Sequence, residues 1–188
     1  MRLIFACLAF LTAACAAAPE TKYYLLESDR PAAARQQSTL PTIGLREIGL
    51  PLYARRPQIA SIGADGSVSA SDDHRWAEDA TRAATRLVAR RLEAVGGGDV
   101  FAEPWPIGAK PELIAAVEID KAIGALGGSV SLTGEIILAR RDARGDAVTT
   151  PFSITTETVR ADHGALAEAY ADAYAALAER IADAAAGL

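Results

Sequence analysis

Apolar residues recur at two different spacings along this chain, and the spacing predicts which segments form strands and which form helices. Strict alternation of apolar and polar residues, or a run rich in aromatic and β-branched residues, is typical of a strand. These patterns predict strands over 23–26, 42–50, 57–62, 67–70, 100–102, 113–123, 130–138 and 152–160. Within 42–50 the apolar phase slips between Leu45 and Ile48, as a β-bulge would cause.

Two longer segments carry apolar residues three and four positions apart, which predicts helices over 75–95 and 164–185. The first apolar stripe consists of Trp76, Ala80, Ala83, Ala84, Leu87, Leu92 and Val95. The second consists of Leu166, Tyr170, Ala173, Tyr174, Leu177, Ile181 and Ala184. Asp72 or Asp73 is expected to cap the start of the first helix, and the three glycines over 96–98 are expected to end it.

Turn residues between the strands complete the predicted fold. Asp65-Gly66 predicts a hairpin, because a tight primed turn needs positive φ, and further turns are expected at 127–128 and 142–146. The long strands each have one apolar and one polar face, which indicates a sheet covered on one side. We therefore predict an α/β (α+β) fold, a two-layer sandwich in which a mostly antiparallel sheet carries two long amphipathic helices packed on one face.

The first residues follow a different pattern, which predicts export. Met1-Arg2 is a short positive start, 3–11 is apolar and 12–14 are small, and together they have the layout of a signal peptide over 1–14. The apolar run is shorter than the roughly 20 residues that a spanning helix needs. Ala13-Ala14-Cys15 resembles the bacterial lipobox, which implies that Cys15 is acylated and becomes the mature N-terminus.

On this interpretation the signal peptide precedes a lipidated tether over 15–21 and a single periplasmic domain over 22–188. The residue after Cys15 is Ala16 and not Asp, which by resemblance to Gram-negative lipoproteins points to the periplasmic face of the outer membrane. The alternative is an ordinary cleaved signal peptide with an incidental Cys15. Cys7 is lost with the leader in either case, so the mature chain keeps one cysteine and forms no internal disulfide.

Charge and motifs point away from nucleic-acid binding and catalysis. The formal net charge of −5 lacks the basic surplus that a nucleic-acid partner usually needs. No zinc-protease, phosphate-loop, dinucleotide-binding or nucleophile-elbow motif occurs, so we predict no catalytic residue, no cofactor and no metal. His74 and His163 lack further ligands at metal-binding spacing, and we interpret them as exposed residues at the starts of the two helices.

The most distinctive stretch runs over 50–59, where two prolines restrain a loop that carries an aromatic residue and two arginines. Arginine and tyrosine are common in binding hot spots. We therefore propose partner binding for Leu50, Pro51, Tyr53, Arg55, Arg56, Pro57 and Gln58. Alternatively, the stretch is a structural crossover between strands, and Tyr53 packs on the protein core. Trp76 is expected to be a core residue, because it lies in register with Ala80.

The leader, the run Tyr23-Tyr24-Leu25-Leu26, the 50–59 stretch and Arg75-Trp76-Ala77-Glu78 together resemble the PqiC/YmbA-like family of ABC-type transport auxiliary lipoproteins. This resemblance implies a lipid-anchored periplasmic accessory subunit of an MCE/ABC-type lipid transport system. It also implies binding to a periplasmic MCE-domain protein, and a role in lipid trafficking between membranes and in envelope integrity.

Two other classes of function compete with this expectation. A stand-alone periplasmic carrier of lipid or another ligand needs an apolar cavity of several hundred Å³. The alanine-rich helices offer few large side chains to line such a cavity. An envelope hydrolase needs a nucleophile paired with a base, and the sequence shows no such pairing.

Charges on the two helices give a separate expectation about assembly. Arg82, Arg86 and Arg90 repeat every four residues on the first helix, and the last helix carries acidic pairs at the same spacing, Glu168 with Asp172 and Glu179 with Asp183. Like charges at this spacing destabilise a helix by a few tenths of a kcal/mol. A basic stripe facing the acidic stripe of an adjacent copy would remove that cost, so the pattern allows a homo-oligomer. The alternative is two solvated faces.

Overall fold

The computed structural model describes residues 20–31, 40–142 and 147–188. The predicted signal peptide, Cys15 and most of the tether lie outside the described residues, as does most of the turn predicted at 142–146. Their assignments therefore stay predictions.

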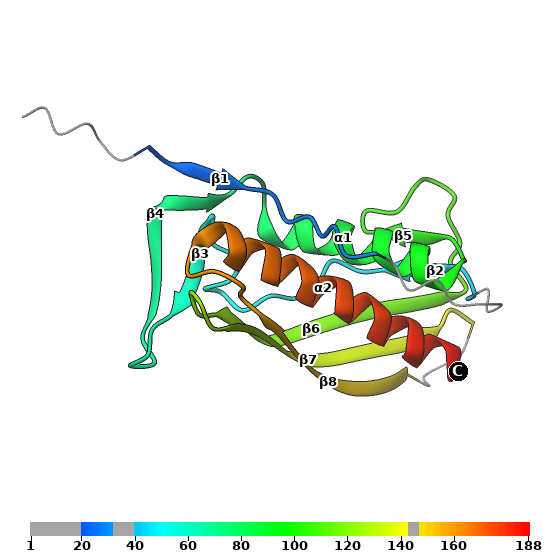
Figure 1. The fold of residues 1–188 in the computed structure, drawn as a ribbon. Coiled ribbons are helices and arrows are strands. Elements are labelled where there is room, and N and C mark those ends of the chain that lie inside the picture. Colours follow the sequence, from blue (N-terminus) through cyan, green and yellow to red (C-terminus); the bar gives the residue numbers. More distant parts are fainter. Residues whose placement is uncertain (1–19, 32–39, 143–146) are drawn as a thin grey trace, which may run out of the picture.

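The described part of the chain contains strands and two long helices in the order shown in Figure 1. The strands are β1 (Lys22–Tyr24), β2 (Ile43–Leu45), β3 (Gln58–Ile62), β4 (Val68–Trp76), β5 (Val100–Ala102), β6 (Leu113–Gly124), β7 (Ser129–Arg140) and β8 (Ala147–Glu157). The helices are α1 (Ala80–Gly96) and α2 (His163–Ala186). Neither helix is both long enough and apolar enough to cross a bilayer.

The strands of the described residues form one eight-stranded mixed sheet. β6, β7 and β8 form an antiparallel meander, and β3 pairs antiparallel with β4. Four other pairings are parallel: β1 with β4, β2 with β5, β2 with β6, and β3 with β6. The prediction of a mostly antiparallel sheet is therefore wrong. Alternation shows which face of a strand is buried, but it carries no information about which strand lies beside it.

The predicted phase slip within 42–50 has a clear structural cause. Regular pairing ends at Leu45, and the chain continues irregularly along the edge of β6, where the Arg46 and Gly49 amides donate to the carbonyls of Ala115 and Val117 at 2.8 and 2.9 Å. Ile48 is turned into the core and its amide donates to Oγ1 of Thr85 on α1, at 3.1 Å. The segment thus keeps its backbone bonds while it changes its buried face.

The start of the first helix differs from the prediction. β4 continues through Trp76, and α1 begins at Ala80, where the Asp79 side chain caps it by accepting from the Arg82 amide at 2.9 Å. Asp72 and Asp73, the predicted caps, lie in β4 instead. The error arises because β4 is a polar strand, so its sequence has no apolar alternation, and the spacing from Trp76 to Ala80 imitated a helix turn.

Two of the predicted glycine signals are confirmed. Gly97 follows α1 in the left-handed region at φ 68°, and its amide donates to the Glu93 carbonyl at 3.0 Å. Gly66 adopts φ 80° between β3 and β4, which is the positive value that the hairpin turn needs. Both positions favour glycine because a side chain disfavours this backbone conformation.

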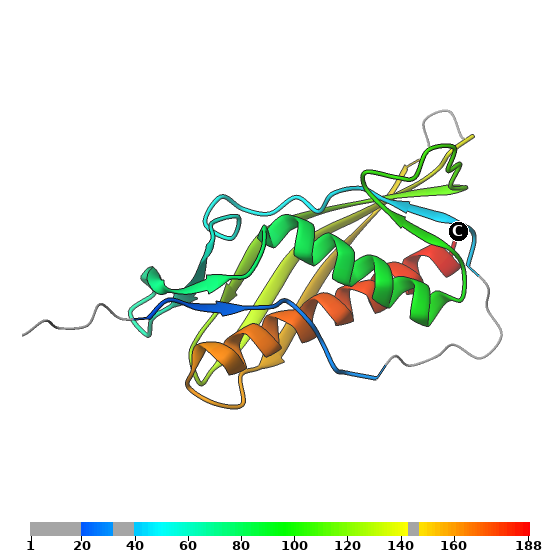
Figure 2. The ribbon, with the colours of Figure 1, turned by 90° about the horizontal axis from the view of Figure 1, so that it is seen from above.

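The two helices lie beside one another over the sheet (Figure 2). Their predicted stripes are buried, apart from Trp76 and Ala184, which are half-buried against the same core. Trp76 meets Tyr170 edge-on, with ring centroids 5.7 Å apart. Alanines such as Ala171, Ala175 and Ala178 are fully buried on α2. Their small side chains let α2 pack closely against its neighbours. The result is a core with large side chains on the sheet and mostly small ones on α2.

Candidate functional site

The stretch proposed for partner binding forms a tight turn between β2 and β3, which pair with different parts of β6. Leu50 is buried in the core, and the amides of Ala54 and Arg55 both donate to the Pro51 carbonyl, at 2.9 and 3.2 Å. At the other end of the turn the Pro57 carbonyl accepts from the Trp76 amide at 2.8 Å. The turn is therefore fixed at both ends by backbone hydrogen bonds.

Tyr53 closes a gap in the backbone pairing of β6. Its hydroxyl accepts from the Ala122 amide at 3.0 Å, just after the register shift between Ile119 and Lys121. β7 pairs with Ala122 on one side of β6, but β3 pairs with β6 only at Gly124, so no strand of the described residues lies beside Ala122 on the other side. The half-buried Tyr53 side chain takes that place and ties the turn to the sheet.

Gln58 and its neighbours on β4 form a small polar cluster. Gln58 Nε2 donates to Asp72 Oδ1 at 2.8 Å, and the Arg75 guanidinium binds the same oxygen at 2.7 Å. The hydrogen bond from Gln58, followed by the Arg75 contacts, holds the pKa of the Asp72 carboxyl below its ordinary value. Gln58 therefore anchors the end of the turn to β4.

Arg55 and Arg56 are the members of the proposed set that face solvent as charged groups. Among the described residues no acid forms an ion pair with either guanidinium. Leu52, which the sequence analysis did not select, is 68% exposed on the same turn. A sharp turn held by Tyr53 thus carries two unpaired cations and an exposed leucine, which is a surface suited to contact with an acidic partner.

The helix charges proposed for assembly have partners within the chain. Arg86 binds both carboxylate oxygens of Glu78 at 2.5 Å, and Arg160 lies 3.5 Å from Glu168. Asp172 accepts a hydrogen bond from Ser28 at 2.6 Å. These contacts reduce the repulsion between like charges along each helix. The hypothesis of a homo-oligomer therefore now depends on Arg82 and Arg90 of α1, which are exposed.

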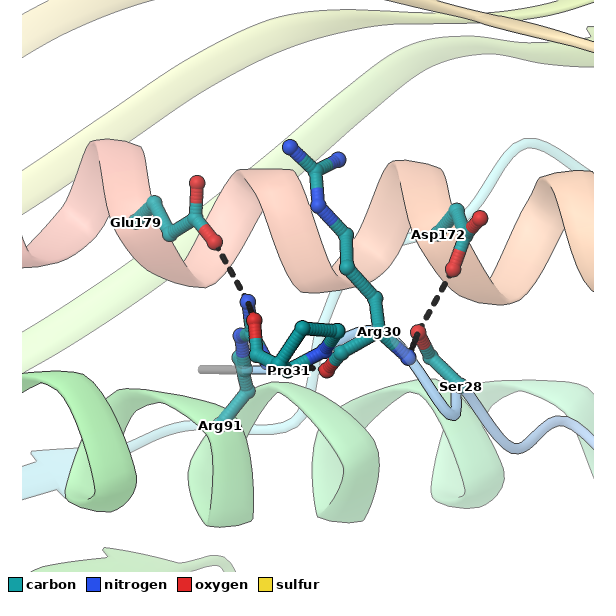
Figure 3. A network of polar contacts seen from close by, with 6 residues as sticks. All are labelled: Ser28, Arg30, Pro31, Arg91, Asp172 and Glu179. Carbon is teal, nitrogen blue, oxygen red and sulfur yellow. Dashed lines mark hydrogen bonds and ion pairs between the residues drawn. The ribbon is translucent and has the colours of Figure 1, made fainter. Parts of the chain in front are cut away.

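A buried arginine joins the two helices to the N-terminal segment (Figure 3). Arg91 on α1 is 91% buried, and its guanidinium donates to the carbonyls of Arg30 and Pro31 at 2.6 and 2.8 Å and to Glu179 on α2 at 2.6 Å. Glu179, expected in an acidic stripe, is therefore the ion-pair partner of Arg91. Sequence reasoning missed Arg91, which departs from the four-residue repeat.

The two histidines, far apart in the sequence, stack on each other with ring centroids 3.7 Å apart. His163 is the first residue of α2, as expected, but His74 lies in β4 and bonds the Tyr24 hydroxyl at 2.9 Å. Both histidines are half-buried, so the expectation of two exposed helix-start residues is wrong. Burial, and next the proximity of His74, lower the pKa of His163. No group of three potential metal ligands occurs among the described residues.

Comparison with known proteins identifies a related family. The family model described as ABC-type transport auxiliary lipoprotein component matches residues 23–182. No curated protein matches the sequence.

Two solved structures share the fold at low sequence identity, and a third shows a weaker likeness. An uncharacterized protein superposes with a TM-score of 0.70 at 16% identity, covering 87% of this chain and 97% of that one. A protein from Xanthomonas campestris gives 0.65 at 15% identity, covering 87% and 90%. PelC from Paraburkholderia phytofirmans, solved as a dodecamer, gives 0.43 at 14% identity, covering 77% and 93%.

The Arg91 network generates a prediction about stability. Arg91→Met removes three hydrogen bonds and leaves the Glu179 carboxylate without its cation, so we expect the free energy of unfolding to fall by about 2–4 kcal/mol. Hydrogen exchange over 25–31 should accelerate as well. Arg90→Met, at the exposed neighbouring position, is the control and should change stability by about 0.5 kcal/mol or less. Equal effects of the two substitutions would contradict the role given to Arg91.

The histidine stack generates a prediction about pH. Because the pKa of folded His163 lies below its ordinary value of 6.5, the unfolded chain binds a proton more readily, and stability should be lost as pH falls through 6.5. His163→Phe keeps a ring on His74 but does not titrate. Urea denaturation between about pH 7.5 and pH 5.5 should show a smaller loss of stability in the variant than in the wild type. Parallel pH profiles for the two proteins would refute the assignment.

Proposed function

The chain belongs to the family of ABC-type transport auxiliary lipoprotein components, and from this premise we propose that it is an accessory subunit of an MCE/ABC-type lipid transport system. The observation that carries the proposal is the extent of the family match, which spans nearly the whole of 22–188. The family is one of membrane-anchored envelope lipoproteins that assist transporters, and it is not a family of enzymes. We propose further that its partner is an MCE-domain protein, that the transported molecule is a lipid, and that the protein is anchored in the outer membrane.

In this proposal Cys15 carries the lipid, and the fixed turn meets the partner. The turn offers Arg55 and Arg56 without acidic partners among the described residues, next to the exposed Leu52. Because Leu50 and Tyr53 hold the turn to the sheet, little conformational entropy is lost when it binds. An acidic surface on the periplasmic MCE-domain protein is the complement that these charges favour.

The alternative of a stand-alone lipid carrier finds less support in the cavities of the described residues. The most apolar hollow, between Leu26, Trp76 and Tyr170, measures about 20 Å³, which is room for about one water molecule. Larger hollows, of about 300 to 480 Å³, are bordered by charged residues such as Arg90, Arg140 and Arg180. An acyl chain would leave such groups desolvated without a partner, which favours the accessory role.

Cys15→Ser tests the anchor. The substitution removes the thiol that acylation needs, so we expect the protein to move from the outer-membrane fraction to the periplasmic extract of a Gram-negative host. Mass spectrometry of the wild-type N-terminus should show the added acyl chains. Cys7→Ser is the matched control, because Cys7 is discarded with the leader. A wild-type protein without fatty acid would contradict the anchored role.

Charge reversal tests the partner surface. We expect Arg55→Glu with Arg56→Glu to reduce the recovery of an MCE-domain protein by about tenfold, after crosslinking and affinity purification from membranes. Arg141→Glu is the control: it reverses a charge that is also exposed, just beyond the end of β7. Failure of the wild type to recover an MCE-domain protein would reject the partner. Equal recovery by both variants would reject the turn as its binding surface.

A further inference from the structure

The outer edge of β8 is the longest strand edge that no described residue pairs with. β8 pairs with β7 along its whole length, and its other side faces away from the sheet. We propose that this edge docks an extended segment of another polypeptide, which adds as a strand and places an acidic side chain beside Arg30 and Arg180.

The direction of the backbone groups on β8 follows from one hydrogen bond. The Thr158 amide, just after the strand, donates to the Gly128 carbonyl at 2.8 Å. Successive residues of a strand point their backbone groups to opposite sides, so the even positions bond β7 and the odd positions point outward. Ser153, Thr155 and Glu157 therefore present amides that pair with no strand of the described residues, and the carbonyls of Pro151, Ser153 and Thr155 are acceptors on the same side.

Pro151 defines which part of the edge can pair. It occupies an outward position, where its missing N–H costs no bond to β7. A docked strand cannot receive a bond from Pro151, so the continuous run of donors begins at Ser153. The docking segment is consequently the second half of β8, from Pro151 to Glu157.

Protection against pairing is confined to the two ends of this half, at Pro151 and Glu157. Natural sheets guard long edges with charged side chains, prolines, bulges or covering segments. Glu157, at the end, is the charged residue of β8, and the pairing with β7 has no register shift. The edges at β1 and β5 are three residues long and offer far less backbone. A regular edge that carries its single charge at the end of the strand is suited to strand addition.

Two adjoining hollows between β8 and α2 would receive the side chains of a docked strand. One measures about 480 Å³ and is lined by Ile136, Phe152 and Ala184. The next measures about 350 Å³ and includes Ile154 and Ala176. Alternate side chains of an added strand point to the same face, so a strand beside β8 directs every second residue toward α2 and these hollows.

The charges beside the second hollow specify the chemistry of the segment. Arg30 and Arg180 border it, and no acid among the described residues forms an ion pair with either guanidinium. Two acids, Glu179 and Asp183, lie on the same border, but Glu179 binds Arg91 and Asp183 also has an interaction of its own. Two cations beside free backbone donors favour a strand with a carboxylate side chain.

A second copy of the chain fits this edge less well. Two β8 strands brought together would place a proline in each ladder. They would also bring no acid other than Glu157, at the strand end, to the two arginines. We therefore assign the edge to a different polypeptide.

The test uses the full chain. The probe is a peptide of alternating threonine and valine with a central glutamate, and both of its termini are chemically blocked. Amide exchange followed by NMR should slow at Ser153, Thr155 and Glu157 when the peptide binds. Thr155→Pro removes a central donor and should abolish binding. Thr149→Pro places proline at an outward position on the other side of Pro151, so it serves as the control and should leave binding intact.

A charge exchange tests the acidic side chain without altering the backbone, which keeps the proposal testable if Thr155→Pro does not fold. Arg180→Glu should weaken binding of the glutamate peptide at least about threefold and strengthen binding of a matched lysine peptide. Equal binding of the two peptides to the wild type would overturn the proposed chemistry. If the peptide does not slow amide exchange at Ser153, Thr155 and Glu157, strand addition at this edge is overturned. If the protein alone has the mass of a dimer and Thr155→Pro abolishes that dimer, the occupant is a second copy and the proposed occupant is overturned.

Discussion

The backbone groups of β6 need hydrogen-bond partners along the full length of this largely buried strand, and much of the molecule is arranged to supply them. One side is filled by β7, in a ladder with a register shift between Ile119 and Lys121. The other is filled in sequence by β2, by the irregular segment that ends at Gly49, by the Tyr53 hydroxyl and by β3. The turn that carries Arg55 and Arg56 exists because the chain must leave the edge of β6 between β2 and β3.

The N-terminal segment is held to the helices by polar contacts more than by apolar burial. Leu26 is its buried side chain, while Arg91 binds its carbonyls and Asp172 binds Ser28. The same arginine bonds Glu179, so α1, α2 and the segment that leads from the predicted anchor meet at one point (Figure 3). A pull on the tether therefore reaches β1 and its pairing with β4 first, and then the segment that Arg91 holds to both helices.

The two sides of the sheet differ in a way that bears on partner binding. Along β6 the second side is closed by an irregular segment that projects a rigid, basic turn. At the far side β8 is long and regular, and its outer edge has no partner strand among the described residues. The first surface offers side chains and the second offers backbone, so the proposed accessory subunit can hold one partner by charge and another by strand addition.

The sequence by itself determined the elements that depend on local period and turn chemistry. The two apolar stripes, the glycine stop after α1 and the Asp65-Gly66 hairpin follow from neighbours within a few residues, as does the restraint of the turn by its prolines. It also selected Arg55 and Arg56, because exposed arginines between prolines stand out by composition alone.

Tertiary structure decided what depends on residues far apart in the chain. The parallel pairings, the stack of His74 on His163 and the Arg91 contacts all join segments tens of residues apart. Period fixes the buried face of an element, whereas its neighbours are chosen by the packing of the whole chain. That is why the sequence located the turn and the helices, and why only the folded chain revealed what holds them together.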